Sequence, residues 1–158
     1  AIYDRYYIEV FRYVRYRIGD EMLAEDITSD VFVSYIKAIQ VQQGPSKNLL
    51  GWLIGTANHK VADHIRHLYR HPVEELQETL PAEASSLPDE VERRERERIL
   101  HWALAQLTND QQHVLALLFG QGYSLEETAA LMGKKVPAVK ALRIRALAAL
   151  QRKLGERK

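Results

Sequence analysis

Hydrophobic residues recur along this chain at the spacing of helices, and no stretch alternates for long as a β-strand would. The first stretch places four large apolar side chains on one face: Tyr7, Phe11, Val14 and Ile18. Gly19 follows as a natural end, because glycine readily adopts the left-handed conformation of a helix C-terminus. The pattern therefore predicts an amphipathic helix that ends near residue 18.

Two further helices are predicted before residue 71. One starts near Met22, and its first turns carry the acidic residues that a helix N-terminus favours. Its expected inner face comprises Ile27, Val31, Tyr35 and Ile39. The other runs from about Asn48 to Tyr69, after a break at Gly44 and Pro45. Its expected inner face comprises Leu50, Leu53, Ile54, Ala57, Val61, Ile65 and Leu68.

Residues 72–89 interrupt the helical pattern with three prolines, several glutamates and a Ser-Ser pair. Such a composition indicates a flexible acidic linker between a first unit, residues 1–71, and a second unit, residues 90–158. Charge also differs between these parts of the chain. Residues 73–98 hold four basic and nine acidic side chains, whereas residues 99–158 hold nine basic and four acidic side chains. Nucleic acid would repel the acidic spacer and attract the basic end.

The second unit shows the signals of four helices. Thr108 with Gln111, and Ser124 with Glu127, have the spacing of capping boxes, in which side chains satisfy the free amides of a helix N-terminus. Asp89 is the expected cap of the helix before them. The inner face of that helix should comprise Val91, Ile99, Trp102, Leu104 and Leu107. We therefore expect an all-α chain, with a three-helix bundle joined by the linker to a four-helix unit.

The last two helices have the arrangement of a helix-turn-helix. The capped helix ends at Gly133, and Pro137 starts a helix rich in lysine and arginine. The expected DNA-binding residues in the turn and on the outer face are Lys134, Lys135, Lys140, Ala141, Arg143, Ile144 and Arg145. Such a helix can enter the major groove while its cations neutralise phosphates. The alternative is a solubilising surface, but the cap, turn and proline favour DNA binding.

The third predicted helix carries a different polar face, close to Trp52 and to the loop at Gly44 and Pro45. It comprises Thr56, His59, Lys60, Asp63, Arg66, His67 and Arg70. Cations beside aromatic residues suit unpaired nucleotides, because bases stack and phosphates attract charge. An ordinary solvated face remains the alternative.

A metal site on this helix is not expected. Its candidate ligands, His59, Asp63, His67 and His71, recur every four residues. Ligands that lie about 6 Å apart per turn of one straight helix cannot all converge on one ion.

Other features indicate a protein without enzymatic activity or cofactors. Asp26 and Asp30 lie one turn apart and suit an exposed patch for another protein better than acid–base chemistry. Phosphate-binding glycine loops, nucleophile elbows and metalloprotease motifs are missing from the sequence. The chain has no cysteine and no apolar run of the roughly 20 residues that a membrane span needs. We therefore expect a cytoplasmic protein that does not insert into membranes.

Several motifs, in order along nearly the whole chain, resemble bacterial RNA polymerase sigma factors of the extracytoplasmic-function (ECF) group. Within the sigma-70 family, this group keeps regions 2 and 4. Residues 24–32, AEDITSDVF, are similar to the family's core-binding helix. Residues 52–66 resemble its promoter-melting helix, although His59 replaces a frequent asparagine. Residues 107–129 and 139–140 resemble the helices of region 4, although residues 136–138 depart from the family's turn.

The resemblance implies specific partners. Region 2 would bind the clamp helices of the largest polymerase subunit through Asp26, Ser29, Asp30 and Val33. It would also hold melted DNA of the −10 element on the third helix. Region 4 would contact the polymerase flap and read the −35 element as duplex. An anti-sigma factor is a further implied partner that would cover these surfaces.

Two other functions stay open from the residues alone. One is a stand-alone helix-turn-helix regulator, which would bind DNA without polymerase. The other, more weakly supported, is a helical metal-dependent hydrolase that would use His59 and Asp63.

Overall fold

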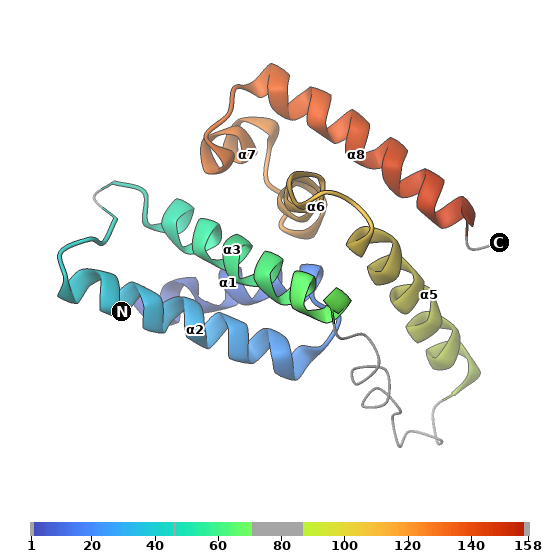
Figure 1. Cartoon of the computed structure of the whole chain (residues 1–158), viewed down its shortest axis with the longest axis horizontal. Helices are drawn as coiled ribbons and strands as arrows, with labels where there is room; N and C mark the ends of the chain where they lie inside the picture. Colours follow the sequence, from blue (N-terminus) through green and yellow to red (C-terminus); the bar gives the residue numbers. More distant parts are fainter. Residues whose placement is uncertain (1, 46, 71–86, 157–158) are drawn as a thin grey trace.

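The computed structural model describes residues 2–45, 47–70 and 87–156 (Figure 1). The first unit contains α1 (Ile2–Arg17), α2 (Glu21–Gln40) and α3 (Leu49–Arg70). The second unit contains α5 (Pro88–Ala105), α6 (Asn109–Leu115), a π-helical turn η1 (Ala116–Gly120), α7 (Leu125–Met132) and α8 (Val136–Glu156). The described residues form no strand, and the predicted all-α class is confirmed. Most of the predicted linker lies outside the described residues.

Most helix boundaries follow the local signals in the sequence. Both predicted capping boxes form, at Thr108 and at Ser124. Gly133 has a φ of 65°, which closes α7 in the left-handed conformation that glycine adopts without strain. The predicted cap at Asp89 is wrong, because α5 already begins at Pro88. Proline is favoured at a first helical position, since its φ is helical and its missing N–H would have no partner there.

The first unit buries an apolar core between α1, α2 and α3. It comprises Val10, Tyr13, Val14, Ile18, Ala24, Ile27, Val31, Phe32, Leu53, Ile54, Ala57 and Val61. The predicted inner faces are confirmed at most positions. Ile39 is an exception, because it lies in the last turn of α2 against the loop at Gly44 and is 49% exposed.

The second unit buries its own core between α5, α6, α7 and α8. It comprises Leu104, Leu107, Val114, Leu115, Ala129, Val139, Leu142, Ala146 and Ala149. The prediction that Val91 and Trp102 are buried is wrong, since both side chains are exposed. The buried residues of α5 are Ala103 and Leu104 near its C-terminus, and its N-terminal half extends away from the other helices (Figure 1).

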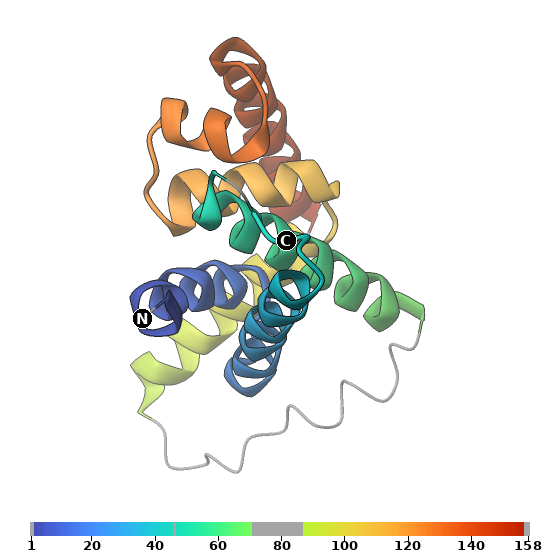
Figure 2. The same ribbon diagram turned by 90° about the vertical axis from the view of Figure 1, so that its left-hand side faces the viewer.

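The two units lie against each other, as the two perpendicular views show (Figures 1 and 2). Ala116 and Leu117 of η1 belong to the core of the first unit. The η1 turn contacts α1, and α7 contacts α3. The hydrophobic pattern predicted two cores but not this contact between them.

Candidate nucleic-acid and polymerase interfaces

All seven candidate residues of the helix-turn-helix lie either in the loop before α8 or in the first three helical turns of α8. Lys134, Lys135, Lys140, Ile144 and Arg145 are exposed, and Ala141 and Arg143 are half-buried. Val139, Leu142 and Ala146 face the core, so the helix presents its cationic side outward. The cationic side of α8 is therefore exposed to solvent.

A shallow groove beside α8 contains a residue that the sequence pattern did not indicate. Asp110, in the first turn of α6, lines this groove together with Lys134, Ala138, Ala141 and Arg145. A carboxylate close to two cations lowers the positive potential on this edge of the helix. Asp110 lies near α8 only because α6 packs against α8.

The polar face of α3 lies along one side of the first unit. His59, Asp63, Arg66 and His67 are exposed, and Thr56 and Lys60 are half-buried. Asp63 and Arg66 form an exposed ion pair one turn apart, which contributes little to stability. The Arg70 side chain lies outside the described parts, and so does His71.

The candidate polymerase-binding residues lie on one outward face of α2. Asp26, Ser29, Asp30 and Val33 are all exposed there. Three further exposed apolar residues of α2 were not among the candidates, namely Met22 at 75%, Ile36 at 54% and Ile39 at 49% exposure. A contiguous set of exposed apolar and acidic side chains is typical of a protein-binding surface.

A groove connects the candidate residues of α2 with those of α3. It is lined by Leu23, Asp26, Ile27, Asp30, Lys60, Asp63 and His64. The polymerase-binding and DNA-binding candidates of the first unit are therefore neighbours across two helices. Periodicity alone could not show this proximity, because it depends on how α2 and α3 pack.

In the part of the chain that the structure describes, no three His, Asp or Glu side chains come together in a group that could hold a metal ion. None of the helices in this part has the length and apolar character that a membrane span requires.

Comparison with known proteins assigns the chain to a family. Residues 2–71 match the model of Sigma-70 region 2, and residues 103–152 match that of Sigma-70 region 4. The ECF RNA polymerase sigma factor SigD of Mycobacterium tuberculosis H37Rv is 33% identical, over 90% of this chain and 70% of its own length. The chain belongs to the ECF sigma factors. The family resemblance seen in the sequence is confirmed.

Two other comparisons show how far the similarity extends. The ECF sigma factor BldN of Streptomyces coelicolor is 34% identical over 98% of this chain, but the chain spans only 60% of that relative. The structure of the sigma factor RpoE of Bartonella quintana, in complex with the anti-sigma factor NepR, superposes with a TM-score of 0.60. At 21% identity, covering 98% of this chain and 94% of that one, this likeness shows a shared fold.

Regions 2 and 4 of this sigma factor meet at a buried polar cluster, which we call the junction cluster. It comprises Tyr13, Arg17, Asn58, Asn109, Gln112 and His113. Arg17 Nη1 donates to Tyr13 Oη at 2.7 Å and to Asn58 Oδ1 at 2.6 Å, both within region 2. Its Nη2 donates across the junction to Asn109 Oδ1 at 2.6 Å and to Gln112 Oε1 at 3.3 Å.

Among the described residues, the buried cation of the junction cluster has no acidic partner. Arg17 is only 7% exposed, and its four acceptors are neutral oxygen atoms. Its Nε atom is buried without a hydrogen-bond partner, so the bonds of Nη1 and Nη2 must offset most of the cost of burying the charge. The signal in the sequence is an arginine within the apolar face of the first helix, one turn after Tyr13.

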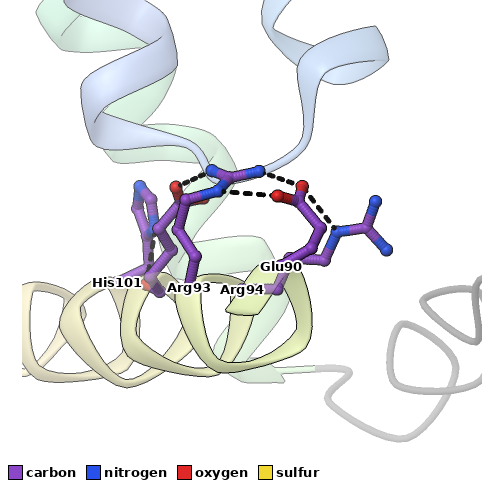
Figure 3. Close-up of polar contacts among 5 residues, drawn as sticks. Glu90, Arg93, Arg94 and His101 are labelled. Atoms are coloured by element: carbon purple, nitrogen blue, oxygen red, sulfur yellow. Dashed lines mark hydrogen bonds and ion pairs between the residues drawn. The ribbon is translucent and has the colours of Figure 1, made fainter. Parts of the chain in front are cut away.

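Helix α5 also contacts α1 at this junction. His101 Nε2 lies 3.2 Å from the backbone oxygen of Tyr16, and its Nδ1 lies 2.9 Å from that of Glu97. Figure 3 shows His101 on α5 with the exposed ion pairs of Glu90 with Arg93 and Arg94. Because those pairs are exposed, they contribute less to the position of α5 than the contact of His101 with α1.

The stability of the folded chain should depend on the protonation of His113. Burial is the main cause that lowers the pKa of His113 to about 3, and the nearby Arg17 and His59 contribute to the same shift. The unfolded chain binds this proton below about pH 6.5, whereas the folded chain does not bind it until about pH 3. The free energy of unfolding should therefore fall by about 1.4 kcal/mol per pH unit between these values. Urea denaturation between pH 7 and pH 5 measures this slope.

A glutamine in place of His113 supplies the control. In the His113→Gln variant, the part of the slope that comes from His113 should vanish, whereas His59→Gln, at an exposed position, should retain it. Equal pH dependence in the parent and the His113→Gln variant would contradict the assignment.

Proposed function

We propose that this sigma factor binds core RNA polymerase and directs initiation at promoters with a −10 and a −35 element. Region 2 would engage the −10 element and region 4 the −35 element. The observation that carries the proposal is the presence of three exposed surfaces, on α2, α3 and α8, in a chain that matches both regions.

The α2 surface suits the polymerase. Asp26 and Asp30 offer negative charge, and Met22, Val33 and Ile36 offer exposed apolar area on the same helix. Apolar contacts supply binding energy, while complementary charge speeds association and selects the partner. We infer that this surface binds the clamp helices of the largest subunit, and that region 4 contacts the flap.

The α3 surface suits melted DNA. Lys60, Arg66 and His59 lie on its polar face, and Trp52 packs edge-on against Tyr35 near the start of α3. Flipping a base out of a duplex costs a few kcal/mol of stacking, which binding to the protein must return. Aromatic rings and cations are the groups that return it. The Asp63–Arg66 ion pair would have to rearrange if Arg66 binds a phosphate.

The α8 surface suits duplex DNA, and Arg143 tests it. In the Arg143→Ala variant, binding to a −35 duplex should weaken several-fold, and the slope of log K against log salt should become shallower by about 0.9. The control is Arg152→Ala, which removes an exposed cation two turns further along α8. Fluorescence anisotropy over a range of salt concentrations measures both. An unchanged slope in Arg143→Ala would exclude Arg143 from the phosphate contacts.

An anti-sigma factor is the further partner that we propose. The structurally similar RpoE is in complex with the anti-sigma factor NepR. The exposed apolar residues on α2 of this chain provide a surface that such a regulator could cover.

The main alternative is a stand-alone helix-turn-helix regulator, and one experiment separates it from the proposal. Purified chain is mixed with a promoter library, with and without core polymerase, and start sites are mapped. A sigma factor confers start-site selection only when polymerase is present. Protection of specific DNA without polymerase, and no selective initiation with it, would favour the regulator.

A further inference from the structure

One acidic residue lies at the edge of the cationic side of α8. Asp110, in the first turn of α6, lines a groove whose opposite wall comes from α8 and from the turn before it. That wall includes Lys134, Ala138, Ala141 and Arg145. Asp110, Lys134 and Arg145 are all exposed. A carboxylate therefore shares one groove with two of the cations that we expect to meet DNA.

The α8 wall of this groove belongs to the side of the helix that would face the duplex. Ala138, Ala141 and Arg145 are separated by three and four residues, so they lie along one side of α8. Ala141 and Arg145 are also among the residues that we propose to contact the −35 element. A phosphate that approaches Arg145 from this side would therefore also approach Asp110.

The charge of Asp110 is not neutralised within the groove. Of the ion pairs among the described residues, none joins Asp110 to Lys134 or to Arg145. The carboxylate is therefore available to act on a charged ligand that enters the groove.

The other acidic residues of this part of the chain are placed differently. From α6 onward the sequence contains three besides Asp110. Glu127 belongs to a capping box, and Glu156 pairs with Lys153 at 3.7 Å. Neither of these nor Glu126 lines the groove. Asp110 is therefore the carboxylate that is positioned to act on DNA bound beside α8.

We propose that Asp110 restrains DNA binding by region 4, so that α8 holds duplex of any sequence weakly until polymerase and region 2 supply further contacts. The inference rests on the proposed function and adds a determinant of affinity to it. Contacts of lysine and arginine with phosphates supply essentially all of the non-specific affinity for DNA. A carboxylate beside these cations repels the same phosphates, so it lowers the affinity without contacting a base.

The restraint has a consequence for the search for promoters. Non-specific sites in a genome greatly outnumber specific ones, so even moderate non-specific affinity sequesters a DNA-binding protein. Weak binding to each of these sites leaves more of the free chain available to polymerase.

The Asp110→Asn variant tests the restraint, because it removes the charge and nearly preserves the size of the side chain. The probe is a labelled duplex of mixed sequence, and the full chain is used without polymerase. At about 50 mM salt, the affinity of the variant should be about threefold to fivefold higher than that of the parent. The slope of log K against log salt should become steeper by up to about 0.9. Fluorescence anisotropy measures both, and an unchanged affinity and slope would overturn the proposal.

Two further variants separate the local charge from other causes. Asp110→Glu retains the charge and should bind like the parent. Glu92→Gln removes one negative charge from the N-terminal half of α5, which extends away from the other helices (Figure 1), and should change the affinity less than about twofold. If Glu92→Gln strengthened binding as much as Asp110→Asn, the net charge of the chain and not the groove would be the cause. Circular dichroism checks that each variant is folded.

A comparison of sequences distinguishes the restraint from the reading of a base. A carboxylate can accept a hydrogen bond from the amino group of cytosine in the major groove. If Asp110 had that role, Asp110→Asn would weaken binding to a −35 duplex and change the preference at one base pair, contrary to the proposal. The restraint instead requires a similar gain in affinity for the −35 duplex and for the mixed duplex.

Initiation with polymerase is a separate readout. With unrelated duplex DNA as competitor, Asp110→Asn should lose promoter-directed initiation at an about threefold lower competitor concentration than the parent. Equal sensitivity to the competitor would contradict the consequence for promoter search. If Asp110→Asn binds the mixed duplex more tightly but neither chain directs initiation, the proposed function fails and the restraint does not.

Discussion

The Asp26→Arg variant should lose measurable binding to core RNA polymerase and remain folded. Asp26 is exposed on the outward face of α2, so the change places an arginine within the proposed interface and disturbs no core contact. A like charge that replaces a complementary one in an interface costs several kcal/mol, which corresponds to a loss of affinity of about 100-fold or more. Titration of labelled chain with core polymerase measures the affinity.

The neighbouring Glu25 offers a matched control. Glu25 is also exposed, but it lies toward Tyr7 of α1, whose pKa is raised by burial first, then by Tyr3 and by the charge of Glu25. Glu25→Arg therefore makes the same change of charge on another side of α2 and should retain binding. If Asp26→Arg bound like the parent, or if both variants lost binding equally, the assignment of the outward face of α2 would be wrong.

The largest expected effect on stability comes from Asn58→Ala. Asn58 Oδ1 accepts hydrogen bonds from Arg17 at 2.6 Å and from Asn109 Nδ2 at 3.2 Å. Its loss leaves a buried guanidinium partly unsatisfied, and the free energy of unfolding should fall by about 3 kcal/mol. Urea denaturation followed by circular dichroism measures the change. His59→Ala, next to it but exposed, should cost less than about 0.5 kcal/mol.

A double-mutant cycle separates the hydrogen bond from lost packing. In an Arg17→Met background the buried charge is absent, so Asn58→Ala should cost clearly less than it does in the parent. An equal cost in both backgrounds would show that Asn58 does not act through Arg17.

The pairing of Arg17 with Asn58 could not be predicted from the sequence. The apolar face of α1 was recognised at Phe11, Val14 and Ile18, but the buried Arg17 beside them was not. Arginine normally lies at the surface, and its burial is possible here because Asn58, 41 residues later, and Asn109, 92 residues later, supply acceptors. Side-chain periodicity carries no information on such distant pairs.

The sequence predicted the exposed residues of some helices correctly and those of others incorrectly. On α8, the spacing of the buried apolar residues correctly predicted that the cations face outward. Both this spacing and the turn at Gly133 are local features of the sequence. On α5, Val91 and Trp102 have helical spacing but are exposed, because spacing cannot show how far along a helix its neighbours extend. The proximity of the α2 and α3 surfaces across one groove also depended on packing.

The sequence by itself determined the all-α class, the two cores, most helix ends and the family. Each of these depends on interactions within a few residues or on motifs that can be read in order. Only the tertiary structure decided that regions 2 and 4 meet along α1, and that Arg17 is buried between them. Those contacts join residues about 90 to 115 positions apart, and their formation depends on how preformed helices fit together in space.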